Sequence, residues 1–193
     1  MGQKALIGIG SNKKSLWGDP EVTIETAIRR FRSLALEAIR ISSFYATPAY
    51  PVGAGPDFVN VAVVFDTDVA AQDLLCALHE IEAAAGRTRA LRWGQRTLDL
   101  DLIALGDLVL PDAATQRHWR DLPGDAQASE APDQLILPHP RVQDRSFVLV
   151  PLADVAPDWR HPLLGLSVLQ MLERLPAADR ASVVPLHRTG ATR

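Results

Sequence analysis

The residues between Arg87 and Asp101 have the types and spacing of a site that handles phosphate groups. From Thr97 the chain alternates polar and apolar side chains, Thr-Leu-Asp-Leu-Asp-Leu, a pattern typical of a half-buried strand. Asp99 and Asp101 would then lie on one face of that strand, with their Cα atoms roughly 7 Å apart. Two carboxylates on a rigid strand suit Mg²⁺, which binds a few carboxylates together with substrate phosphates.

Arginines are concentrated just before this strand. They are Arg87, Arg89, Arg92 and Arg96. A planar guanidinium can bond two phosphate oxygens at once, so these side chains suit the phosphates themselves. Paired aspartates alone, or an arginine-rich loop alone, more often form a solvated surface. Aspartate is a poor strand former, however, and two of them on one strand beside arginines break a local rule in the way expected of functional sites.

Composition and charge limit the function classes. The 193 residues are enough for one domain with a sizeable core, and the net charge of -3 argues against a general nucleic-acid binder. A single cysteine, Cys76, excludes an intramolecular disulfide and a multi-cysteine zinc site. The sequence has no apolar segment long enough to predict a signal peptide or a membrane span. We therefore expect a cytoplasmic protein without nucleic-acid or membrane partners. We also expect it to be a monomer.

The periodicity of the chain predicts an α+β fold. We expect strands at 5–9, 39–45, 58–65 and 97–102, a first helix beginning at Pro20, and a second helix capped by Asp68 and ended by Gly86. This order is that of the ferredoxin-like βαββαβ core, an antiparallel sheet with both helices on one face. Asp99 and Asp101 would lie on the other, open face, which loops would cover.

The second half of the chain gives weaker signals. Residues 106–107 are expected to turn the fourth strand back toward 108–110, and 111–134 to form a surface insertion with a short helix at about 115–120. The run 147–152 fits a helix or a strand, Ser167 should cap a last helix, and the end of the chain should fray. His139, held between prolines and followed by arginines, is as suited to facing phosphate as to a structural role. A single domain of 1–193 accommodates all of this.

Several short motifs resemble one known family. They are Gly10-Ser11-Asn12, Ser43-x-Tyr45-x-Thr47-x-x-Tyr50, Asp57-Phe58-x-Asn60, Ile81-Glu82-x-x-x-Gly86-Arg87-x-Arg89, Arg92-Trp93-Gly94-x-Arg96-Thr97-Leu98-Asp99-Leu100-Asp101 and Leu137-Pro138-His139-Pro140-Arg141. In this order they closely resemble the 6-hydroxymethyl-7,8-dihydropterin pyrophosphokinases of folate biosynthesis, from the first strand to about Pro157. Gln95 stands where the family usually has proline, and Gly55 where glutamine is common.

The resemblance implies transfer of pyrophosphate from ATP to the pterin hydroxymethyl group, giving AMP and the pterin diphosphate. Asp99 and Asp101 would hold two Mg²⁺ ions, and Arg87 and Arg96 would neutralise charge on the transferred group. The implied ATP-binding residues are Glu82, Arg89, Arg92, His139 and Arg145. The implied pterin-binding residues are Thr47, Pro48, Tyr50, Phe58, Asn60, Trp93 and Phe147. Without the resemblance, Phe58 and Phe147 would be interpreted as core residues.

Two other functions fit parts of the pattern. A ferredoxin-like domain with aromatic residues on its open face could bind RNA, but it would need a basic surface and no central aspartate pair. A nucleotidyltransferase could also use Asp-x-Asp with arginines, and it would release free pyrophosphate. If the chain acts on ATP and a pterin, the loops around Trp93 and residues 52–55 are expected to close over the site and exclude water.

Overall fold

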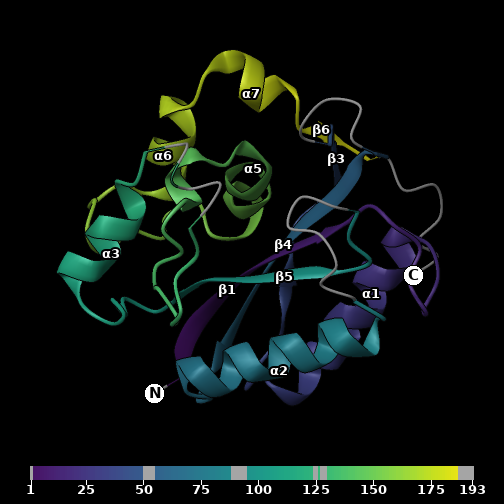
Figure 1. Ribbon diagram of the computed structural model, residues 1–193. Coiled ribbons are helices and arrows are strands. Elements are labelled where there is room, and N and C mark those ends of the chain that lie inside the picture. The colour runs from purple at the N-terminus through teal and green to yellow at the C-terminus, as the bar shows by residue number, and fades with distance from the viewer. Residues whose placement is uncertain (1, 50–54, 88–94, 124–125, 127–129, 187–193) are drawn as a thin grey trace.

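The centre of the molecule is an antiparallel sheet (Figure 1). The computed structural model describes residues 2–49, 55–87, 95–123, 126 and 130–186. The strands are β1 (Gln3–Ser11), β2 (Arg40–Ile41), β3 (Tyr45–Thr47), β4 (Phe58–Thr67), β5 (Asp99–Leu105) and β6 (Val184–Pro185). They are ordered β5-β1-β4-β3-β6, and β2 also pairs with β4. Asp99 and Asp101 therefore lie on one edge strand, β5, and the last strand of the described residues, β6, lies on the opposite edge.

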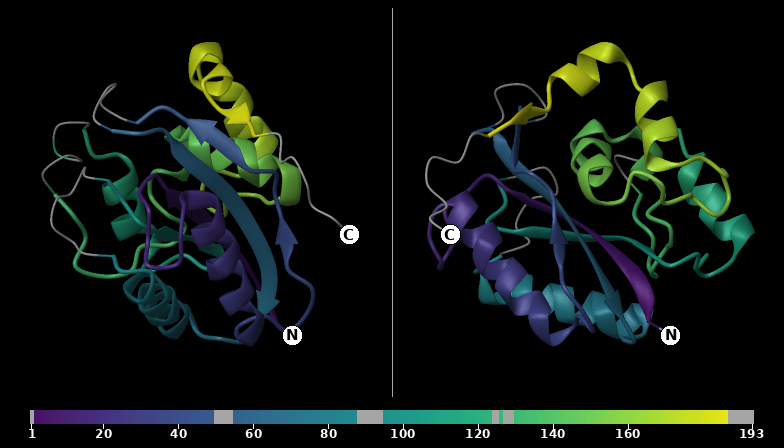
Figure 2. Two further views of the ribbon diagram at one scale, coloured as in Figure 1. Left: turned by 90° about the vertical axis from the view of Figure 1, so that its right-hand side faces the viewer. Right: turned by 180° about the vertical axis from the view of Figure 1, so that it is seen from behind.

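Two helices cover one face of this sheet, as predicted. They are α1 (Pro20–Arg30), followed by the short 3₁₀ turn η1 (Phe31–Ser33), and α2 (Ala71–Ala84). Both lie on the same side of the strands in Figure 1 and Figure 2. Leu98, Leu100 and Leu102 point into the core on this side, which confirms the predicted phase of β5. The helix-forming signal at Pro20 is also confirmed, because this proline occupies the first turn of α1.

The βαββαβ order is confirmed, but the second predicted strand is interrupted. The structure has β2 and β3 in place of one strand at 39–45. Between them, the Ser42 hydroxyl accepts a hydrogen bond from the Ala62 N–H at 2.9 Å, while the Ser42 N–H donates to the Ala62 carbonyl at 2.9 Å. A side-chain oxygen thus replaces one backbone acceptor of the ladder. The predicted start of α2 is also wrong, since Ala70 and not Asp68 occupies its N-cap.

The second face of the sheet is only partly open. The helices α5 (Ser146–Val155) and α6 (Val168–Arg174) pack on it, whereas loops alone were expected there. A second core forms between Leu6, Ala62, Val64 and Ile103 of the sheet and apolar residues of α5 and α6. The run 147–152 is thus helical. Ser167 caps α6 as predicted, through a reciprocal capping box with Gln170.

The segment after β5 differs from the prediction. Leu110 forms a bridge with Leu137 and does not return along β5 as a hairpin. The predicted short helix exists as α3 (Ala113–Arg120), capped by the Asp112 side chain. Gln116 of α3 is buried and donates to the Pro138 carbonyl at 3.2 Å, so this helix packs against the chain that leads to His139.

The chain ends with a short 3₁₀ turn η2 (Val142–Asp144), the helices α5 and α6, and then α7 (Ala177–Ala181) before β6. In Figure 1, α7 arches from α6 above α5 to β6, beside β3. Neither α7 nor β6 was predicted, because both are too short to show periodicity. Cys76 is exposed on α2 and free. Among the helices of the described residues, none is long and apolar enough to span a membrane.

Candidate active site

A cavity of about 430 Å³ opens on the second face of the sheet, beside α5. Its lining comes from β1, β3, β4, β5, α5 and α7, which lie far apart in the sequence. The predicted site residues in this lining are Thr47, Pro48, Phe58, Asn60, Arg96, Asp99, Asp101, Arg145 and Phe147. The fold therefore brings the aspartate strand, two arginines and the two phenylalanines to a single hollow.

Two glycines of β1 form part of the floor of this cavity. Gly10 pairs with Asp99 on one side and with Asn60 on the other. A Cβ at Gly10 would lie 3.2 Å from the Asn60 Oδ1 atom, closer than ordinary contact, whereas a Cβ at Gly8 would meet only ordinary contacts. Glycine in a strand interior marks close approach by a ligand or by other atoms. Because glycine has no Cβ, Gly8 and Gly10 leave space above the sheet between the aspartates and Asn60.

Each aspartate faces a guanidinium. Asp99 accepts from Arg87 Nη2 at 2.8 Å and, through its other oxygen, from Arg96 Nη1. Asp101 has a looser contact of 3.4 Å with Arg145 Nη1. The side chain of Asp99 is 16% exposed and that of Asp101 is 35% exposed. Asp101 is thus the more accessible carboxylate for a ligand or a cation.

Arg87 is held from behind by Glu82. Gly86 ends α2 with a φ of +80°, a conformation that favours glycine, and the Arg87 N–H then donates to the Glu82 carbonyl at 3.1 Å. The Glu82 carboxylate pairs with the Arg87 guanidinium and also accepts from the Leu100 N–H at 2.7 Å. Glu82 therefore fixes Arg87 against the edge strand that carries both aspartates, and it does not line the cavity.

Burial shifts the protonation of several of these groups. Burial raises the pKa of Glu82 to about 7, although Arg87 and the Leu100 N–H oppose the shift. Burial and the neighbouring Asp101 carboxylate raise the pKa of Asp99, and the guanidiniums of Arg96 and Arg87 oppose this change. Burial of these ionised carboxylates is therefore unfavourable, and a bound cation would reduce its free-energy cost.

His139 lies near this group but does not line the cavity. Its backbone N–H donates to the Ile103 carbonyl at 2.8 Å, which places it beside the end of β5. Burial and the charges of Arg145 and Arg141 hold the pKa of His139 well below its usual range, so the imidazole is neutral at pH 7. Its Nδ1 atom accepts from the Arg141 N–H at 3.1 Å, and Nε2 must therefore carry the proton.

Asn12 connects the two loops that border the cavity. Its Oδ1 accepts from the Arg96 N–H at 2.8 Å, and its Nδ2 donates to the Pro56 carbonyl at 3.0 Å. The adjacent Ser11 hydroxyl donates to the Thr97 carbonyl at 2.7 Å. Both residues are almost fully buried. They belong to the Gly10-Ser11-Asn12 motif, but nothing in their types alone identified them as supports for Arg96.

The predicted ring-binding residues are arranged around Asn60. Asn60 Nδ2 donates to the Thr47 hydroxyl at 2.7 Å, which fixes the orientation of both side chains. Phe147 is 39% exposed, and the Arg145 guanidinium carbon lies 5.6 Å from its ring centroid. Phe58 is half-buried. Neither phenylalanine belongs to a buried core, so the interpretation of these two residues as core residues is wrong.

Some predicted residues cannot be placed in this way. Tyr50, Arg89, Arg92 and Trp93 lie outside the described residues, and so do both predicted lid loops apart from Gly55. A Cβ at Gly55 would lie 3.4 Å from the Gln95 side chain. The two positions that depart from the usual residues of the family thus face each other, and Gln95 occupies the space beside Gly55.

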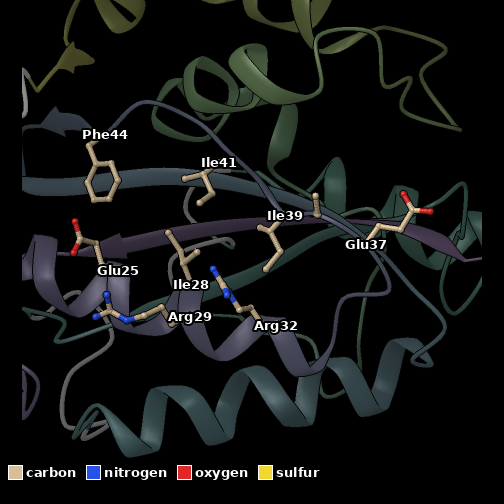
Figure 3. A pocket seen from close by; sticks show the side chains of 9 residues that line it. Glu25, Ile28, Arg29, Arg32, Glu37, Ile39, Ile41 and Phe44 are labelled. Atoms are coloured by element: carbon tan, nitrogen blue, oxygen red, sulfur yellow. The ribbon is translucent and has the colours of Figure 1, made fainter. Parts of the chain in front are cut away.

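A second hollow, of about 580 Å³, lies between α1 and the strand β2, on the face that carries α1 and α2 (Figure 3). Its apolar residues include Ile28, Ile39 and Phe44, and its charged residues are Glu25, Arg29, Arg32 and Glu37. The aspartates of β5 line the other cavity, on the opposite face. The smaller hollow, which brings together carboxylates, guanidiniums and two aromatic rings, is therefore the candidate site.

The donor set fits Mg²⁺ with phosphates better than a protein-only metal site. In the part of the chain that the structure describes, no three His, Cys, Asp or Glu side chains gather to hold a metal. Of the three carboxylates that line the cavity among the described residues, Asp99 and Asp101 lie on one strand, whereas Asp179 comes from α7. Mg²⁺ typically takes one or two carboxylates and completes its coordination with waters and substrate phosphates.

Two curated proteins are similar to most of this chain. A Pseudomonas aeruginosa 2-amino-4-hydroxy-6-hydroxymethyldihydropteridine pyrophosphokinase is 37% identical over 184 residues, covering 91% of this chain and 99% of the relative. A Synechocystis protein of the same name is 35% identical, covering 94% of this chain and 80% of the relative.

The fold also has solved counterparts. A crystal structure of wild-type Plasmodium falciparum HPPK-DHPS matches 90% of this chain with a TM-score of 0.59 at 16% identity, and this chain spans 45% of that one. The family model for 7,8-dihydro-6-hydroxymethylpterin-pyrophosphokinase matches residues 6–157, which include every site residue described above on β1, β3, β4 and β5. The chain belongs to the 7,8-dihydro-6-hydroxymethylpterin-pyrophosphokinase family.

Proposed function

We propose that the protein transfers the pyrophosphoryl group of ATP to the hydroxymethyl group of 6-hydroxymethyl-7,8-dihydropterin, as a single-domain enzyme of folate biosynthesis in the cytoplasm. The observation that carries the proposal is one cavity lined by Asp99, Asp101, Arg96 and the rings of Phe58 and Phe147. Phosphate chemistry and recognition of a flat ring would thus occur side by side. The family match and its curated relatives support the same reaction.

Asp99 and Asp101 would hold two Mg²⁺ ions, which supply charge neutralisation for the phosphates and make the substrate hydroxyl a better nucleophile. Arg96 and Arg87 would oppose the negative charge that develops on the transferred group. Loss of such a contact typically costs ~10²-fold or more in rate. Glu82 would act through Arg87, by holding that guanidinium against β5.

The remaining residues would bind and orient the substrates. Arg145 would hold the triphosphate, and neutral His139 would donate from Nε2. Arg89 and Arg92 are proposed for ATP from the sequence pattern alone. Phe58 and Phe147 would stack on the pterin ring, and Asn60 would bond its polar edge. Thr47, Pro48, Tyr50 and Trp93 are proposed to complete the wall. We further propose that the protein acts as a monomer.

Identifying the nucleotide product tests this proposal. The purified protein is incubated with Mg-ATP, with and without the hydroxymethyl-dihydropterin, and the nucleotides are separated by chromatography. We expect AMP to form only when the pterin is present, in equal amount to the pterin consumed. Formation of ADP alone would reject the proposal, and free pyrophosphate would favour a nucleotidyltransferase.

A further inference from the structure

The C-terminal strap, which we define as residues 177–186, forms part of the wall of the candidate site. It comprises α7, β6 and the residues between them. Asp179 and Ser182 of the strap line the cavity together with Phe58 and Phe147. The family match ends at residue 157, so these two side chains come from a part of the chain that the family model does not cover.

The strap is fixed at its far end to the strand that leads into the cavity wall. In β6, Val184 pairs with Ala46 and Pro185 pairs with Tyr45. The Leu186 N–H then donates to the Phe44 carbonyl at 2.7 Å, and Val183 is buried. Residues 47 and 48, which follow this pairing directly, line the cavity. The position of α7 is thus tied to the wall near Thr47.

Asp179 and Ser182 present acceptor oxygens to the cavity. They are three residues apart, so they lie on one face of the helical turn. The Ser182 hydroxyl donates to the Asp179 carbonyl at 2.7 Å. Within the described ranges, the Asp179 carboxylate has no hydrogen bond or ion pair. A carboxylate beside two aromatic rings, without a protein partner, is free to bond a ligand.

The order of the strands indicates which part of the substrate Asp179 would contact. The aspartates occupy β5 at one edge, whereas the strap joins the opposite edge through β6. These edge strands are four strand spacings apart, about 19 Å at the usual interstrand distance. A second negative charge near the triphosphate would also repel it. Asp179 therefore suits the end of the substrate that carries N–H donors and no phosphate.

Resting on the proposed function, we propose that the strap is a specificity element of the pterin site. The Asp179 carboxylate accepts hydrogen bonds from N–H groups of the pterin ring, and Ser182 supports the same edge. A substrate ring without N–H groups at that edge would face the carboxylate without a hydrogen bond, which makes such a substrate less favourable. The strap thus adds selection for amino-substituted heterocycles to the contacts made by Asn60.

Steady-state kinetics of AMP formation test this inference. The variants are Asp179→Ala, Asp179→Asn and Ser182→Ala, and the matched control is Glu173→Gln, which removes the same charge from an exposed position of α6. We expect Asp179→Ala to raise the KM for the pterin by about 10-fold, as for loss of a hydrogen bond to a charged group. The KM for ATP and kcat should stay within about twofold. Asp179→Asn keeps an acceptor oxygen, so its KM for the pterin should lie between those of the wild type and Asp179→Ala.

Pterin binding measured by ligand fluorescence, with Mg²⁺ and a non-hydrolysable ATP analogue, gives a second readout. The dissociation constant should rise in parallel with the KM. The inference would be overturned if the pterin KM and dissociation constant were unchanged in Asp179→Ala. An equal change in Glu173→Gln would overturn it as well. In both cases, pterin-dependent AMP formation by the wild type would leave the proposed function intact. A wild-type protein without pterin-dependent AMP formation would instead overturn the function, and the inference with it.

Discussion

At the scale of single residues, the two aspartates differ more than their spacing suggests. Asp99 is enclosed by Arg87 and Arg96, whereas Asp101 has one long contact with Arg145. Removing Asp99 leaves two guanidiniums close together without their shared partner. Removing Asp101 leaves a single, half-exposed guanidinium that water can reach. The same loss of a metal ligand should therefore have different effects on stability.

We predict that Asp99→Ala and Asp101→Ala both abolish Mg-dependent AMP formation. The free energy of unfolding of Asp101→Ala should stay within about 0.5 kcal/mol of the wild type, as for most exposed substitutions. That of Asp99→Ala should fall by about 1–3 kcal/mol, because the guanidiniums of Arg87 and Arg96 each lose one charged acceptor. Urea unfolding without Mg²⁺ measures both values. Equal stabilities of the two variants would show that the arginine contacts around Asp99 contribute nothing to folding.

Glu82 predicts a pH dependence of stability. Its pKa rises from 4.5 to about 7 on folding, so the folded protein binds this proton more tightly than the unfolded chain. The free energy of unfolding should consequently fall as the pH increases through this window, with a slope of at most about 1.4 kcal/mol per pH unit from this group. Stability should be highest on the acid side of the window and level off above it.

The matched variant is Glu82→Gln, which keeps an acceptor for the Leu100 N–H but cannot ionise. Urea unfolding of both proteins in EDTA, at pH values on either side of the window, isolates the contribution because other groups cancel in the difference. The wild type should lose stability relative to Glu82→Gln as the pH rises. Parallel pH profiles would mean that Arg87 fully compensates the burial of the carboxylate.

At the scale of elements, the strand β1 and its following turn position groups that belong to other segments. Gly10 keeps the floor low beside Asn60, and Asn12 bonds both the Arg96 backbone and the Pro56 carbonyl. None of these atoms needs to touch a substrate to affect catalysis. Their effect would pass through the placement of Asn60 and Arg96.

We predict that Gly10→Ala raises the KM for the pterin by about 10-fold, because the new methyl group crowds Asn60, which Thr47 holds in place. Gly8→Ala is the matched control, since its Cβ would meet only ordinary contacts. Its pterin KM should change by less than about threefold. Steady-state kinetics with saturating ATP compare the two. A larger effect at Gly8 would place the ring nearer to Asp101 than to Asn60.

We predict that Asn12→Ala lowers kcat by at least about 10-fold, since a small displacement of a catalytic group has large effects on rate. It should also lower the free energy of unfolding by about 1–3 kcal/mol, because buried backbone groups lose their partners. Lys13→Ala, at the exposed neighbouring position, is the control. A fall in stability with unchanged kcat would show that Arg96 keeps its position without Asn12.

At the scale of the whole molecule, strong periodic patterns predicted the fold, but the short elements were not predicted. Alternation placed Leu98, Leu100 and Leu102 in the core and the aspartates opposite, because a strand has only two faces. The β2 and β3 interruption depends on one Ser42 hydroxyl, and the bridge between Leu110 and Leu137 joins distant segments. Such choices depend on tertiary partners that no local pattern contains.

The same distinction applies to the site. Charge and spacing identified Asp99, Asp101 and Arg96, and the family motifs added Phe58, Asn60 and Phe147, all of which line one cavity. Asp179 and Ser182 were missed because α7 has only five residues and no motif. Glu82 was expected at ATP, yet its carboxylate is turned toward Arg87 and β5. A sequence pattern names the chemical groups, while the packing decides which of them face the ligand.

In the proposed reaction, the β- and γ-phosphates of ATP move together onto the pterin. ATP labelled with ³²P at the β-phosphate, incubated with Mg²⁺, the hydroxymethyl-dihydropterin and the protein, tests it directly. We predict that the label appears in the pterin product and that the AMP formed is unlabelled, with Asp101→Ala as the inactive control. Label retained in ADP would indicate transfer of a single phosphate, and label in free pyrophosphate would indicate nucleotidyl transfer or hydrolysis. Either result would contradict transfer of the intact pyrophosphoryl group to the pterin.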